Sequence, residues 1–171
     1  MSDIHEELGR AVLESADEMF RAQKRLADSA IRQISFEQMK ATLDEESNSV
    51  AVIMKHLSSA MRSRWTDFLT TDGEKAWRDR DEEFTDHYTS RDQVEKDWEA
   101  GWNALFASLG KLRPVDLTAN VTIRDEPEIV IGAIHRQLSH YGYHLGQLII
   151  QCRTLAGADW STLTIPRSKS K

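Results

Sequence analysis

The chain has 171 residues, of which 40% are apolar and 29% are charged, a composition typical of a soluble globular protein with one buried core. Its formal net charge is −6 and its only basic block is the short segment PRSKSK at 166–171, so neither nucleic acid nor an anionic membrane is expected as a main partner. It contains no run of about 18 apolar residues, so no membrane-spanning helix is predicted.

The first half of the chain predicts two long helices. Only 3 prolines and 8 glycines occur and β-branched runs are scarce, which favours helix over sheet. The first helix is predicted over residues 2–33, with a stripe of Leu8, Val12, Ser15, Met19, Ala22 and Leu26. The polar segment SFEQMKATLDEESNS at 35–49 predicts turns, with room for one short helical turn. A second helix then begins with Asn48 or Ser49 as its N-cap, and its stripe is Val50, Ile53, Met54, Leu57, Met61, Trp65 and Phe68.

The second half predicts two more helices. The second helix should end before TTDGEKAWRDRDEEF, in which Asp72-Gly73 is a strong turn signal. A third helix runs from Ser90 as N-cap to Gly110 as C-cap, with Val94, Trp98, Trp102, Leu105 and Leu109 on its apolar side. The segment PVDLTANVTIRDEPEI, interrupted by two prolines, predicts a loop or a short β-like excursion. The last helix is predicted over 128–155, with a seam of Ile134, Leu138, Tyr141, Leu145, Leu148, Cys152 and Leu155.

Four amphipathic helices joined by short connections predict an all-α four-helix bundle, with under about a tenth of the residues in strands. The sequence shows no internal repeat and no linker, so residues 1–171 are expected to form one domain with a polar tail from about 161.

The last helix also carries a pair of histidines, in the segment HRQLSHYGYHLGQLII at 135–150. His140 and His144 are four residues apart and therefore project from one face, whereas His135 points well away from them. Two imidazoles at this spacing can reach one divalent ion. Partly solvated histidines without a ligand are also common on helix flanks, so the pair alone leaves that interpretation open.

A divalent ion needs at least a third protein ligand, and the candidate is His56. It lies at the margin of the apolar stripe of the second helix, on one ridge with Ile53 and Ala60, so it can face the interior of a bundle. A lone histidine in such a place is more often a hydrogen-bonded core residue than a ligand. His87, in a charged loop, and His5, near the terminus, are weaker candidates.

These histidine segments resemble a known family. The residues KHL at 55–57, together with HYGYHLGQ at 140–147, are similar to the DinB superfamily (DinB/YfiT-like) of metal-binding four-helix bundles, over nearly the whole chain. RWTDFLTTDGEKAWRDRDEEF and WSTLTIPRSKS are similar to a bacterial DinB-like subfamily of unassigned function. The resemblance implies that His56, His140 and His144 are the three metal ligands. No segment matches a known thiol-cofactor pocket.

The resemblance also implies a chemistry. Family members of known activity are thiol-dependent S-transferases or isomerases that use bacillithiol, mycothiol or glutathione. Three neutral imidazoles leave coordination positions open, and they suit zinc or nickel, with iron or manganese as alternatives. Gln147, one turn beyond His144, is a candidate second-shell donor to the ligands. Arg78 and Arg80 are candidates for binding a carboxylate of the thiol or substrate, although RDRDEE also fits a solvated charge network.

Two functions therefore stay open: a metal-dependent thiol transferase, and a non-enzymatic stress-response or small-molecule-binding protein that keeps the metal site. Tyr141 and the single cysteine, Cys152, fall on the core seam and are interpreted as packing residues. One cysteine and a polar first segment favour a reducing cytoplasm. The chain has five tryptophans, which are interpreted as core or dimer-contact residues: Trp65, Trp77, Trp98, Trp102 and Trp160. Together with the family resemblance, they predict a homodimer.

Overall fold

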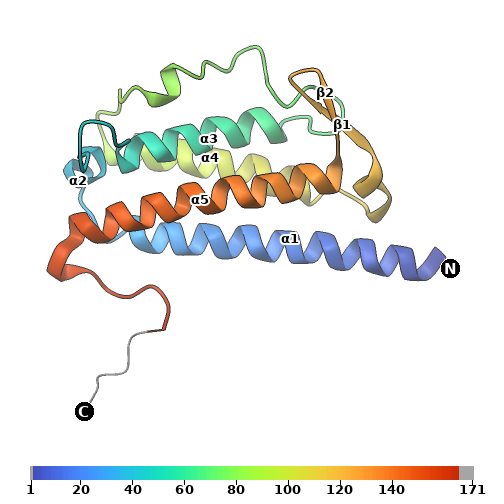
Figure 1. The fold of residues 1–171 in the computed structure, drawn as a ribbon, viewed down its shortest axis with the longest axis horizontal. Coiled ribbons are helices and arrows are strands. Elements are labelled where there is room, and N and C mark those ends of the chain that lie inside the picture. The colour runs from blue at the N-terminus through green and yellow to red at the C-terminus, as the bar shows by residue number, and fades with distance from the viewer. Residues whose placement is uncertain (1, 166–171) are drawn as a thin grey trace.

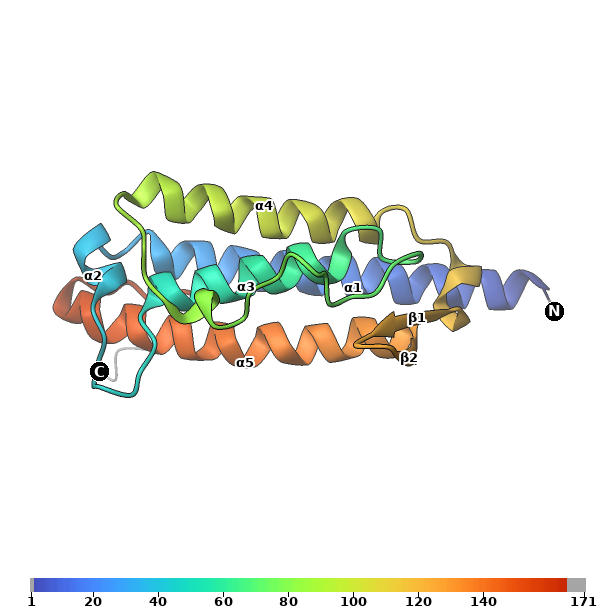
Figure 2. The same ribbon diagram turned by 90° about the horizontal axis from the view of Figure 1, so that it is seen from above.

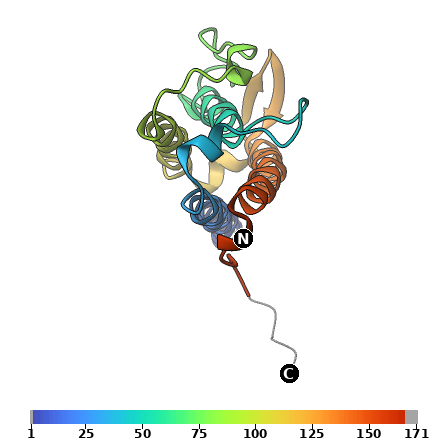
Figure 3. The same ribbon diagram turned by 90° about the vertical axis from the view of Figure 1, so that its left-hand side faces the viewer.

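Four long helices lie side by side in the computed structural model, which describes residues 2–165 (Figures 1 and 2). They are α1 (Ser2–Ile31), α3 (Val50–Trp65), α4 (Arg91–Leu109) and α5 (Val130–Ala156). Seen end on, α3 packs between α4 and α5, and α1 closes the bundle on the opposite side (Figure 3). The predicted all-α four-helix bundle is confirmed.

Short elements connect the long helices. α2 (Phe36–Lys40) is the predicted short helical turn, and Ser35 and Gln38 cap it reciprocally. A single antiparallel pair of strands, β1 (Asn120–Ile123) and β2 (Glu126–Ile129), is the predicted β-like excursion. Within the described residues no helix is both long and apolar enough to cross a membrane.

The helix boundaries follow the predicted caps closely. The Ser49 side chain accepts a hydrogen bond from the Val52 N–H at the start of α3, and Ser90 accepts one from the Gln93 N–H at the start of α4. α4 ends at Gly110, as predicted. α3 ends at Trp65, because Asp67 has a φ of 49° and turns the chain, yet Phe68 is buried beyond the end of the helix.

The predicted stripe of α1 is wrong at Leu8, Ser15 and Met19, whereas Val12 packs against the core. Leu8 is 63% exposed and Met19 is 51% exposed, although both were expected to face the core. The buried side consists of Ala16, Phe20, Ala27, Ala30 and Ile31. The predicted stripe follows helical spacing but lies one residue before the buried one, in which several alanines let the backbone of α1 approach its neighbours. The first turns of α1 also extend past the ends of the other long helices (Figure 1).

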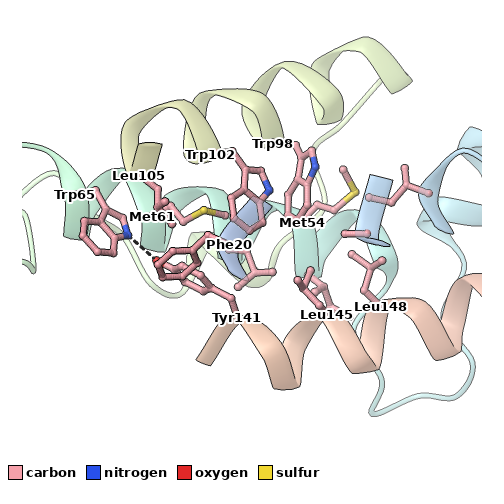
Figure 4. Close-up of a cluster of buried hydrophobic side chains, with 14 of the residues drawn as sticks. Phe20, Met54, Met61, Trp65, Trp98, Trp102, Leu105, Tyr141, Leu145 and Leu148 are labelled. Carbon is pink, nitrogen blue, oxygen red and sulfur yellow. Dashed lines mark hydrogen bonds between the residues drawn. The ribbon is translucent and has the colours of Figure 1, made fainter. Parts of the chain in front are cut away.

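An aromatic cluster occupies the centre of the bundle (Figure 4). Phe20, Trp65, Trp102 and Tyr141 come from all four long helices, and each is at most 1% exposed. The Trp65 indole N–H donates to the Tyr141 hydroxyl over 3.0 Å. The core assignments of Tyr141 and Cys152 are confirmed, and burial raises the pKa of the Cys152 thiol to about 12, so the thiol stays protonated at neutral pH.

Replacing this tyrosine by phenylalanine tests the buried hydrogen bond. Tyr141→Phe keeps the ring but removes the acceptor of the Trp65 N–H, which is then buried without a partner. We expect the free energy of unfolding to fall by about 1–3 kcal/mol, as measured by urea denaturation. Tyr143→Phe is the matched control, because the Tyr143 side chain is exposed on the same helix, and should change stability little. Equal stability of Tyr141→Phe and wild type would show that the bond contributes nothing.

The loop after α3 is fixed to the β1–β2 hairpin by Asp72. Its carboxylate accepts hydrogen bonds from the backbone N–H groups of Glu74, Arg124 and Asp125, at 2.6, 3.0 and 2.9 Å. Partial burial opposes ionisation, but these donors outweigh it and hold the pKa of Asp72 at about 2. Arg124 and Asp125 have φ values of 54° and 62°, as expected of a two-residue hairpin turn. The loop and the hairpin together form one wall of the pocket described below.

Candidate metal centre

Three histidine rings converge between α3 and α5. His56 projects from α3, and His140 and His144 project from consecutive turns of α5. The ring centroids are 5.6 Å apart for His56 and His140, 4.8 Å for His56 and His144, and 4.9 Å for His140 and His144. One nitrogen of each ring lies within 4.8 Å of the corresponding nitrogens of the other two. The structure thus brings together the three residues that the sequence singled out.

Two of the rings are oriented by an oxygen atom behind them. Glu83 Oε2 lies 2.8 Å from Nδ1 of His56, and Gln147 Oε1 lies 3.1 Å from Nδ1 of His144. An ionised carboxylate only accepts hydrogen bonds, so His56 donates from Nδ1 and keeps Nε2 free. The sequence predicted Gln147 as a hydrogen-bond donor. In the structure its side-chain oxygen faces the His144 ring, so Gln147 accepts the hydrogen bond instead. Oxygen acceptors of this kind fix the tautomer of metal-binding histidines.

Glu83 is itself held in place by Arg78. The Arg78 guanidinium donates to both carboxylate oxygens, from Nε to Oε1 at 2.6 Å and from Nη2 to Oε2 at 3.0 Å. Its Nη1 donates to Glu74 over 3.1 Å. Burial alone would raise the pKa of Glu83, but the hydrogen bonds from His56 and Arg78 lower it to about 2. Arg78 therefore supports His56 through Glu83.

The two histidines of α5 are in the protonation state that metal ligands require. Burial, followed by the neighbouring charges of His144, His56 and the nearby arginines, lowers the pKa of His140 to about 4. Burial and His56 also lower the pKa of His144, against an opposing hydrogen bond to Gln147. Both rings are therefore neutral at pH 7, the form that binds a metal.

The other histidines lie apart from this cluster. His135 is exposed and faces away from the cluster, as predicted, and His87 is exposed and contacts Glu82 at 3.0 Å. His5 is exposed near the start of α1. Sequence reasoning missed Glu83, which lies in a run of charged residues that all looked solvated. It also missed Phe84, whose ring stacks on His56 at a centroid distance of 5.1 Å.

A pocket of about 460 Å³ opens beside His56 and His140. It lies between α3 and α5, and the loop after α3 and the β1–β2 hairpin complete its walls. Arg78 and Arg80 both line it, so their predicted role in binding a ligand stays a prediction. The arginines of the lining are Arg64, Arg78, Arg80, Arg124 and Arg136, and Glu74 is its one acidic residue.

Comparison with models of protein families gives a match over nearly the whole chain. The family model described as "Protein of unknown function (DUF1572)" matches residues 7–169. Searches of curated proteins and of solved structures found no match. The match covers α1 from residue 7, all of α3, α4 and α5, and the three histidines of the cluster.

Proposed function

Since the chain belongs to the DUF1572 family of proteins of unknown function, we propose a function from the site itself: a metal-dependent enzyme whose divalent ion is held by His56, His140 and His144. The observation that carries the proposal is the convergence of three imidazoles from two helices, with Glu83 positioned behind His56. The same histidine pattern supports placing the family in the DinB-like superfamily. The single, buried cysteine supports a reducing, cytoplasmic location.

The donor set fits a divalent ion that prefers nitrogen ligands. Nitrogens that share one tetrahedral ion at about 2.0–2.1 Å lie about 3.3–3.4 Å apart. The three nitrogens lie within 4.8 Å of one another, so each pair must approach by up to about 1.5 Å to close the site. Imidazole ligands favour zinc or nickel, with iron or manganese as alternatives.

The open pocket beside the histidines favours an enzyme over a purely structural site. Three protein ligands leave positions free, and the bound ion would supply Lewis acidity or hold a low-molecular-weight thiol as its thiolate. A volume of about 460 Å³ is in the range of small-molecule sites. We therefore propose a thiol-dependent S-transferase. The alternative, a non-enzymatic metal-binding bundle, requires a pocket that accepts no substrate.

Metal analysis of the purified protein, followed by a thiol-conjugation screen, tests this proposal. The ion present is identified first, and the loaded protein is then offered glutathione, bacillithiol and mycothiol with a panel of electrophiles. We expect one divalent ion per chain and conjugation that requires both the ion and His140. Metal binding without any conjugation would favour the non-enzymatic alternative, and absence of metal binding would reject the site.

Glu83→Gln should weaken metal binding. The substitution removes the charge that orients His56 and leaves Arg78 without its main partner. Loss of such a carboxylate typically costs 10–100-fold in metal affinity. We expect that decrease in a competition titration with Zn²⁺ and a chromophoric chelator. The matched control is Glu82→Gln, since Glu82 is the exposed neighbour that contacts His87 instead. Equal affinities of both variants would contradict a supporting role of Glu83.

We also propose a homodimer. Trp65, Trp98 and Trp102 are buried in the core, so the tryptophans no longer support a contact surface, apart from the exposed Trp77. Support comes instead from the apolar side chains that α1 leaves exposed, Ile4, Leu8 and Met19. Sedimentation at micromolar concentration should give twice the chain mass of 19.6 kDa. A single 19.6 kDa species would contradict the dimer.

A further inference from the structure

We propose that the pocket beside the three histidines binds a ligand through its carboxylate or phosphate group, and that Arg64 and Arg136 are the residues that bind this group. The proposal that these arginines bind an anion is argued from the pocket alone and does not depend on the metal site. The further statement, that the same ligand reaches the ion, rests on the proposed metal site.

Arg64 is the main observation. Its side chain is only 4% exposed, and its Nη1 is buried without a hydrogen-bond partner among the described residues. The nearest carboxylate oxygen, Glu128 Oε2, is 3.7 Å away, which is too far for a hydrogen bond, and it already accepts one from Arg136. The ion pair with Glu128 therefore leaves Nη1 without a hydrogen-bond acceptor, and a buried donor without an acceptor is costly. A ligand oxygen in the pocket would supply it.

The backbone makes room for this guanidinium. A Cβ at Gly73 would lie 3.0 Å from Arg64 Nη1 and 3.2 Å from its Cδ, so the arginine packs flat against the glycine. Gly73 is fixed in turn by its N–H, which donates to Thr122 of β1 over 2.8 Å. Burial, and then the charge of Arg136, lowers the pKa of Arg64 to about 10, and the side chain remains a cation at neutral pH. The position is built around a charged arginine.

The other charges of the pocket leave a positive excess. Arg78 is occupied by Glu83 and Glu74, and Arg124 reaches the same Glu74 at 3.5 Å. Among the described residues that line the pocket there are five arginines and one acidic residue, Glu74. Glu83 and Glu128 do not line the pocket but pair with its arginines. An anionic ligand is therefore the complement that the pocket favours.

Helix geometry sets the size of the ligand. His56, Ala60 and Arg64 follow one another at four-residue spacing on α3, and Arg136, His140 and His144 do the same on α5. The two helices run in opposite directions (Figure 1), so Arg64 and Arg136 are expected at one end of the pocket and the three histidines toward the other. Four residues of a helix rise about 6 Å and eight residues rise about 12 Å. The ligand should therefore carry its anionic group about 6–12 Å from the atom that meets the ion.

Titration of the metal-free protein with inorganic phosphate and with malonate tests the anion site without the metal. The backbone N–H signal of Gly73, against which Arg64 packs, is present in wild type and in every variant below. In ¹H–¹⁵N spectra of wild type it should shift saturably with at least one of the two anions, and the anion that binds identifies the preferred group. Arg64→Met should weaken binding by about tenfold or more. Arg21→Met is the control, because Arg21 is paired with Asp17 on α1, and should bind as wild type does. If Arg64→Met does not fold, the anion affinity of Arg136→Gln is measured instead, because the Arg136 side chain is 45% exposed and tolerates replacement. Equal binding by wild type and the folded pocket variant, or no saturable shift with either anion, would overturn the proposal.

A Co²⁺-loaded protein tests the link to the ion. Mercaptohexanoate and mercaptohexanol have the same length and differ in the charged end. The thiolate–cobalt absorption band should titrate at about tenfold lower concentration with the acid than with the alcohol, and Arg64→Met should abolish this difference. If both thiols titrated the wild-type protein at the same concentration, the proposal that one ligand reaches both the arginines and the ion would be overturned. Failure of Co²⁺ to bind would reject the metal centre, while the phosphate and malonate titrations would still decide the anion site.

Discussion

His140→Ala and His144→Ala are each expected to lower the affinity for Zn²⁺ by at least about a hundredfold. Each substitution leaves two imidazoles, and two nitrogen ligands make a weak site for a divalent ion. His56→Ala should have the same effect, because its ring lies within 5.6 Å of both partners by centroid distance. Isothermal titration of the purified apo-proteins with Zn²⁺ measures the loss directly.

His135→Ala is the matched control for these variants. His135 lies on the same helix as His140 but is exposed and faces away from the cluster, so its replacement should leave the affinity unchanged. Thermal unfolding separates a catalytic site from a structural one, since a catalytic site should leave the bundle folded without the ion. A hundredfold loss in His135→Ala, or full affinity in His140→Ala, would contradict the assignment of ligands.

Gly101→Ala should destabilise the bundle by at least about 2 kcal/mol. Gly101 lies on α4 where it crosses α3, and a Cβ there would come within 2.7 Å of the Ser58 Cα. Because that atom belongs to the backbone, the clash cannot be relieved by a side-chain rotation, and one helix must shift. Chemical denaturation should show the lower free energy of unfolding.

Gly146→Ala, on α5, is expected to raise the free energy of unfolding instead. No atom lies within 4 Å of the Cβ it would add, so only the gain in helix propensity acts, worth up to about 1 kcal/mol. The sign of the two effects should therefore differ. If Gly101→Ala were as stable as wild type, the close approach of α3 and α4 would not be required for the fold.

Much of the fold follows from local signals in the sequence. Ser49 and Ser90 are N-caps because their hydroxyls accept a backbone N–H, and this chemistry depends only on neighbouring residues. The face shared by His140 and His144 follows from helix geometry in the same way. The pairing of α3 with α5, which brings His56 to them, rested on the family resemblance.

Other features depend on contacts between distant segments. Glu83 is 27 residues from His56 and stands among charged residues that looked alike. Arg64 was not among the predicted site residues, although its spacing of four and eight residues from Ala60 and His56 could have linked it to the site. The buried face of α1 was predicted one residue too early, because Met19 and the neighbouring Phe20 both fit a helical stripe and only packing decides between them.

The metal centre is tested most directly by a crystal structure of the zinc-loaded protein with anomalous diffraction at the zinc edge. The proposed site predicts one ion whose ligands are a nitrogen of His56, of His140 and of His144, each at about 2.0–2.3 Å. An ion bound elsewhere, or three ordered histidines without an anomalous peak between them, would contradict it.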